Sequence, residues 1–138
     1  MVVDVVGLGT AGVLAGLAGW HVYWAAGGRV GTAAVVPTAD GRALLTPSTV
    51  ATLVVAGLLA VSAALLVGGV AGWEPRLLFR VGSGGIAAVL LARAVGDGRT
   101  IGVFKRRRGT PFARRDTWLY SPLCVLLAVA AAAVATRA

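Results

Sequence analysis

Four long apolar tracts, separated by short charged segments, constrain this 138-residue chain more than any other feature. A helix needs roughly 20 apolar residues to cross the hydrocarbon core, and a chain in lipid must satisfy its backbone hydrogen bonds internally. The sequence therefore predicts an all-α polytopic membrane protein with four transmembrane helices in an antiparallel bundle. We expect a single membrane domain, 1–138, with spans at about 5–26, 47–72, 77–95 and 117–136, and a basic cytoplasmic loop at 96–116.

Composition excludes a small soluble domain. Hydrophobic residues make up 58% of the chain and charged residues 13%, against about 45–50% and 25% in soluble proteins. The net charge of +8 would suggest nucleic acid in a soluble protein, but here the basic residues are placed by the membrane. We therefore expect no nucleic-acid partner.

The distribution of Lys and Arg predicts the orientation. The first and third loops hold nine of these residues, seven of them in the third loop, and the opposite side holds three. Basic loops remain in the cytoplasm. We expect a multi-pass protein of the plasma (inner) membrane, with loops 1 and 3 cytoplasmic and both termini outside.

Residues 7–12, GLGTAG, match the Gly-x-Gly-x-x-Gly dinucleotide fingerprint but lack its context. No acidic residue between Asp4 and Asp40 could bind the ribose, and the chain cannot supply a parallel sheet. We interpret these glycines as packing residues, like Gly12-x-x-x-Gly16 and Gly68-x-x-x-Gly72. We expect no cofactor, and the lone Cys124 excludes dithiol chemistry within the chain.

Polar side chains gather at the predicted cytoplasmic ends of the first, third and fourth spans. Arg93 and Asp97, and likewise Asp116 and Tyr120, are four residues apart and would share a helix face. We predict that this cluster binds a small ligand, a lipid headgroup or a partner. Its candidate residues are His21, Tyr23, Trp24, Arg93, Asp97, Arg99, Asp116 and Tyr120.

Simpler roles exist for most of these residues. Tyr23 and Trp24 suit an aromatic belt, Arg93 could extend to the headgroups or pair with a carboxylate, and Asp116 could cap the fourth helix. The loop 96–116 is expected along the membrane surface, with Ile101, Val103 and Phe104 toward lipid. We predict that its basic run contacts lipid headgroups, which are expected to be anionic, through Lys105, Arg106, Arg107 and Arg108.

His21 is the only histidine and lies just inside an apolar helix, where ionisable residues tend to be functional or paired. We expect His21, Asp97 and Asp116 to approach one another, with Arg93 or Arg99 balancing the carboxylates. One alternative is an enzyme that uses His21 and Asp116 as an acid–base pair on a lipid-like substrate. Another is a structural subunit of a homo-oligomer or larger membrane complex. No metal is expected, because metal-ligand spacing is absent.

Four sequence motifs recur together in a known family. They are HVYWAAGG (21–28), VVPTADG (35–41), GDGRTIGVFK (96–105) and TPFARRDTWLYSPLC (110–124). In this combination the chain resembles an uncharacterised family of small bacterial four-helix integral membrane proteins, a domain-of-unknown-function family with HxYWAxGG and FAxxDxxxYSPLC motifs. The resemblance implies an all-helical membrane fold and no assigned activity. The family's recurring polar positions correspond to His21, Tyr23, Trp24, Asp97, Arg99, Lys105, Asp116 and Tyr120.

Overall fold

The computed structural model describes the backbone of residues 1–138 and the side chains of residues 1–37 and 40–138. Four long helices dominate it. They are α1 (Val2–Ala25), α3 (Thr49–Ala71), α4 (Arg76–Val95), and a continuous fourth helix formed by α5 (Pro111–Arg115), the π-helical turn η1 (Asp116–Tyr120) and α6 (Ser121–Ala135). All four are long and apolar enough to cross a membrane. The prediction of an all-α, four-helix membrane protein is confirmed.

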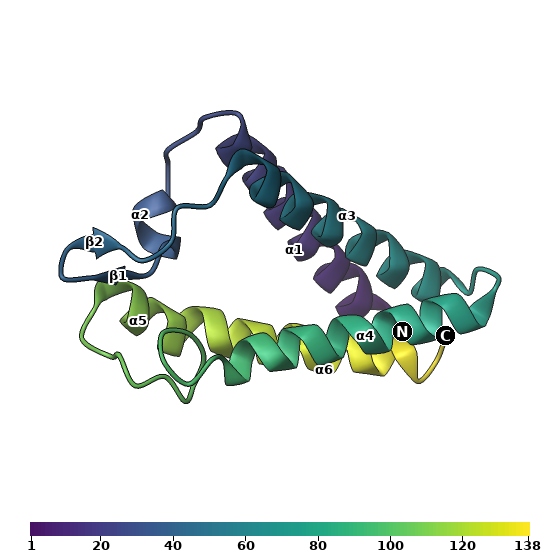
Figure 1. The fold of residues 1–138 in the computed structure, drawn as a ribbon. Coiled ribbons are helices and arrows are strands. Elements are labelled where there is room, and N and C mark those ends of the chain that lie inside the picture. Colours follow the sequence, from purple (N-terminus) through teal and green to yellow (C-terminus); the bar gives the residue numbers. More distant parts are fainter.

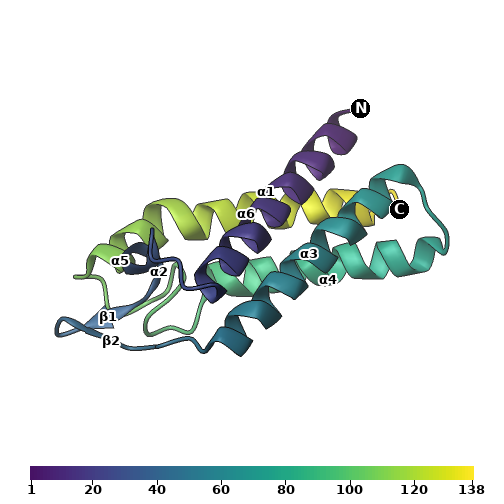
Figure 2. The same ribbon diagram turned by 90° about the horizontal axis from the view of Figure 1, so that it is seen from above.

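The helices form two pairs that meet at one end and diverge toward the other (Figure 1). α1 packs along α3, and α4 packs along α6, while α1 contacts α6 and α3 contacts α4 less extensively. The chain termini lie where the pairs meet, which we call the closed end (Figures 1 and 2). The opposite end, the open end, carries the connection from α1 to α3 and the connection from α4 to α5 (Figure 1).

Glycines explain the tight packing at the closed end. A Cβ atom on Gly7 of α1 would lie 2.7 Å from Val134, and one on Gly69 of α3 would lie 2.8 Å from the same side chain. The ring of Phe79 likewise occupies the space beside Gly68. Larger residues at these positions would force the pairs apart, because close-packed interiors leave no such room.

The glycines of Gly12-x-x-x-Gly16 behave differently from the packing residues that the sequence suggested. A Cβ atom added to Gly12, Gly16 or Gly19 would meet nothing within 4 Å among the described residues. These positions lie on the exposed side of α1, whereas Leu14 and Ala11 face the core. Within the described chain, their small size serves no helix contact.

Two helices begin at different residues from those expected. α3 begins at Thr49 rather than at 47, because Ser48 caps it: the Ser48 hydroxyl accepts a hydrogen bond from the backbone N–H of Ala51 at 3.1 Å. Helical structure before α6 begins at Pro111 rather than near 117, because the Thr110 hydroxyl accepts from the Ala113 N–H at 3.1 Å and proline suits the first turn. Asp116 is therefore inside the fourth helix and does not cap it.

The connection from α1 to α3 contains α2 (Thr32–Val35) and two short antiparallel strands, β1 (Thr38–Ala39) and β2 (Arg42–Ala43). The turn between the strands has positive φ at Asp40 (51°) and Gly41 (73°), as a type I′ hairpin requires. α2 contacts α5, so this connection closes over the start of the fourth helix (Figure 1). The fold thus brings both open-end connections to the same place.

Candidate functional site

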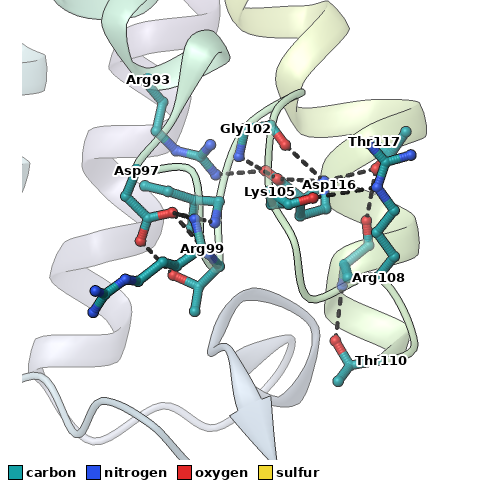
Figure 3. Close-up of polar contacts among 12 residues, drawn as sticks. Arg93, Asp97, Arg99, Gly102, Lys105, Arg108, Thr110, Asp116 and Thr117 are labelled. Atoms are coloured by element: carbon teal, nitrogen blue, oxygen red, sulfur yellow. Dashed lines mark hydrogen bonds and ion pairs between the residues drawn. The ribbon is translucent and has the colours of Figure 1, made fainter.

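A buried carboxylate lies at the centre of the open-end polar groups. The Asp116 side chain is fully buried, and its Oδ2 accepts from the Lys105 ammonium at 3.0 Å and from the Gly102 N–H at 2.7 Å. Its Oδ1 accepts from Nη2 of Arg93 at 2.8 Å. Figure 3 shows α4, the loop and the fourth helix each contributing to this cluster. Two cations therefore neutralise a single buried negative charge.

The π-helical turn η1 sets the position of Asp116 relative to α6. Pro122 lacks an N–H, and in a regular helix its ring would clash with the carbonyl four residues earlier, at Trp118. A wider turn over Asp116–Tyr120 relieves that conflict without ending the helix. Tyr120 then donates its hydroxyl to the Ala34 carbonyl at 3.0 Å. The fourth helix is thereby tied to α2.

Lys105 differs most from expectation, because it is buried and does not face lipid headgroups. Its ammonium donates to Asp116, to the Gly102 carbonyl at 2.9 Å and to the Thr117 hydroxyl at 2.6 Å (Figure 3). All three ammonium protons are used. A buried carboxylate requires a cation, and the loop folds back to provide one. The prediction that Lys105 contacts lipid headgroups is therefore wrong, and Lys105 has a structural role.

Asp97 organises the loop that follows α4. Its Oδ1 accepts from the N–H groups of Arg99, Thr100 and Ile101 at 2.8, 2.7 and 3.0 Å, and its Oδ2 accepts from the Thr100 hydroxyl at 2.6 Å (Figure 3). The Thr100 hydroxyl, followed by these backbone donors, lowers the pKa of Asp97 well below its ordinary value. The carboxylate is thus held by its own loop.

Glycines close the same loop. Gly96 ends α4 with φ 84°, and Gly102 has φ 85°. A Cβ atom on Gly96 would lie 1.9 Å from the Ile101 carbonyl oxygen, and one on Gly102 would lie 2.3 Å from that of Val95. Because the helix stops at Val95, Asp97 is not on a helical face with Arg93, contrary to the spacing argument.

The structure does not bring His21, Asp97 and Asp116 together through hydrogen bonds. Nδ1 of His21 lies 2.7 Å from the Leu17 carbonyl oxygen of its own helix, and the ring packs edge-on against Trp24 with centroids 5.1 Å apart. Among the described side chains, His21 has no contact of hydrogen-bond length with either carboxylate. Both carboxylates accept hydrogen bonds from donors in the 93–105 segment, and they therefore do not need the imidazole as a partner.

The aromatic residues after His21 hold the first connection in place. Trp24 donates its indole N–H to the Val30 carbonyl at 2.8 Å. The Val30 N–H in turn donates a long hydrogen bond of 3.5 Å to the Tyr23 hydroxyl. A Cβ atom on Gly28 would lie 2.3 Å from the Tyr23 ring. This segment, HVYWAAGG, therefore shapes the loop that follows α1.

Six arginines around this framework remain exposed. Among the described residues, none of them forms an ion pair with a carboxylate, although the Arg108 Nε donates to the Lys105 carbonyl at 3.2 Å. The apolar side chains of Val103 and Phe104 in the same loop are also exposed, whereas Ile101 is half-buried. We call the six arginines the basic surface: Arg99, Arg106, Arg107, Arg108, Arg114 and Arg115.

These observations define a small multi-pass membrane protein whose recurrent polar residues build a loop framework at one end of the helices. The chain belongs to the family described as "Protein of unknown function (DUF3995)", whose model matches residues 14–131. The matched region includes the aromatic segment, the Asp97 loop and Asp116. No curated protein and no solved structure matches the chain.

Proposed function

We propose that the open end of this protein binds anionic phospholipid headgroups through the basic surface. The proposal rests on a difference between the basic residues at this end of the helices. Lys105 and Arg93 neutralise Asp116, whereas the six arginines of the basic surface have no carboxylate partner among the described residues. The framework thus fixes the loop and leaves the arginines for an external anion.

A membrane surface suits this anion better than a soluble partner does. The basic surface lies in the loop after α4 and in α5, and exposed Phe104 and Trp118 belong to the same loop and to the turn that follows α5. Aromatic rings of this kind favour the layer in which headgroups lie, and each arginine near an anionic surface contributes about 1 kcal/mol. On the positive-inside rule, the basic surface faces the cytoplasm of the cell and its anionic leaflet.

The enzyme alternative has less support. Both oxygens of Asp116 accept from cations. His21 donates from Nδ1 to its own helix, which leaves Nε2 as an acceptor, but among the described residues no carboxylate orients the ring. A general base needs a free acceptor within reach of the substrate proton. The subunit alternative is favoured by the unpacked glycines Gly12, Gly16 and Gly19, which would allow a second helix to approach α1. Cysteine cross-linking along α1 would detect such association.

The lipid proposal is tested with Arg106→Gln/Arg107→Gln protein in bilayers that contain phosphatidylglycerol and phosphatidylcholine. We expect native mass spectrometry to find retained phosphatidylglycerol reduced several-fold relative to the unmodified protein. Arg29→Gln/Arg42→Gln is the matched control, because it removes the same charge from the other open-end connection. Equal retention by all three proteins, or an equal loss in both variants, would overturn the role of the basic surface.

A further inference from the structure

We infer that a cavity at the closed end binds a phosphoethanolamine group, a ligand that carries one phosphate and one primary ammonium. This site is independent of the basic surface, which lies at the opposite end of the helices. The cavity has a volume of about 270 Å³ and lies between the start of α1, the end of α3, the start of α4 and the end of α6. All four membrane-crossing helices therefore contribute to it.

The cavity has an apolar floor and a charged rim. Val70 and Val134 line the floor, and Asp4, Arg76 and Arg137 lie at the rim. Gly69 and Gly72 leave space at the end of α3, where larger residues would intrude. Its volume is below the roughly 300–1,000 Å³ of sites for drug-sized molecules. The cavity therefore suits a headgroup, with any attached acyl chains outside it along the helices.

The rim carries both signs of charge. Arg137 Nη1 lies 3.6 Å from Asp4 Oδ1, and both side chains are about half exposed. The Nε of Arg76 donates to Oε1 of Glu74 at 3.1 Å. The terminal nitrogens of Arg76 have no partner among the described residues. Arg76 begins α4 and Arg137 follows α6, and both line the cavity. We expect one phosphate to take the place of their carboxylate partners, because two guanidinium groups suit a phosphate.

Asp4 supplies the complementary charge for the ammonium. Its Oδ1 faces Arg137, whereas its Oδ2 contacts the Met1 amino group at 2.5 Å, which a ligand ammonium would have to displace. Primary ammonium donates hydrogen bonds, whereas the quaternary ammonium of choline has no N–H. The rim should therefore prefer phosphoethanolamine to phosphocholine.

The test uses the full chain in bilayers that hold equal amounts of phosphatidylethanolamine and phosphatidylcholine, followed by native mass spectrometry of retained lipid. We expect phosphatidylethanolamine to be retained several-fold over phosphatidylcholine. Arg76→Gln and Arg137→Gln should each reduce this retention at least three-fold, and Asp4→Asn should remove the preference between the lipids. Arg80→Gln is the control, because Arg80 lies one turn further along α4 and does not line the cavity.

Competition by soluble phosphoethanolamine distinguishes the source of the group. Displacement of bound lipid at low millimolar concentration, without a lipid preference in bilayers, would assign the site to a free solute. Equal retention of the two lipids together with no effect of soluble phosphoethanolamine would overturn the inference. An equal loss in Arg76→Gln and Arg80→Gln would also overturn it, and this comparison stands even if Arg137→Gln fails to fold.

Discussion

Lys105 and Arg106 are adjacent in a run of basic residues, yet their surroundings are opposite. Lys105 is buried against Asp116, and Arg106 is exposed. A buried Asp116 requires a nearby cation, and the sequence indicates Arg93 as one partner. It missed Lys105 because nothing local marks one lysine among arginines as facing inward. That choice depends on how the 96–110 loop folds back over the fourth helix.

Replacement of Lys105 by Met should strongly destabilise the protein, because it leaves the fully buried carboxylate with Arg93 alone. Loss of one partner from a buried ion pair costs about 3–5 kcal/mol. Arg106→Met is the control and should change the unfolding free energy by less than about 0.5 kcal/mol. Unfolding by SDS titration in mixed micelles would measure both. A Lys105→Met protein as stable as the control would show that the ion pair contributes little.

At the scale of elements, the long helices were the predictable part and their ends were not. Uncharged tracts of spanning length admit few structures in lipid, so four helices follow directly from composition and spacing. The end of α4 shows the difficulty, because charge spacing suggested that the helix continues to Asp97. Gly96 was the available signal, since glycine with positive φ commonly ends a helix.

The loop of residues 96–102 should respond to acid in a defined direction. Because the folded-state pKa of Asp97 is lowered, its contribution to loop stability is fully present above the unfolded pKa of about 3.9. It is lost as the pH falls below that value. Amide hydrogen exchange at Thr100 and Ile101, corrected for intrinsic rates, should therefore show constant protection from pH 5 to 8 and loss of protection in stronger acid. In Asp97→Asn protein, protection should be weak throughout; strong protection there would contradict this role.

At the scale of the whole molecule, the two ends differ in what they present. The open end carries the basic surface and a rigid loop framework, whereas the closed end carries the mixed-charge cavity. Sequence alone could not predict the cavity, because its lining comes from four helix ends that are distant in the chain. It did indicate which end is basic, and orientation in the membrane depends on that asymmetry.

Orientation is tested by cysteine labelling in intact cells, in a Cys124→Ala background. We expect cysteines introduced at positions 42 and 107 to react only after the cytoplasm is opened, and a cysteine at position 74 to react with an impermeant reagent from outside. The positive-inside rule gives this result, since the first and third connections carry most of the basic residues. The reverse pattern would place the basic surface outside the cell.

The divergence of the two helix pairs also has a mechanical consequence for the surrounding bilayer. Because the pairs separate toward the open end (Figure 1), the protein occupies more area in the leaflet at that end than in the other leaflet. A flat bilayer must bend or redistribute lipid around such a wedge. The strain is smallest where the leaflet at the open end lies on the convex side of a curved membrane. We therefore expect molecules of this shape to favour such sites.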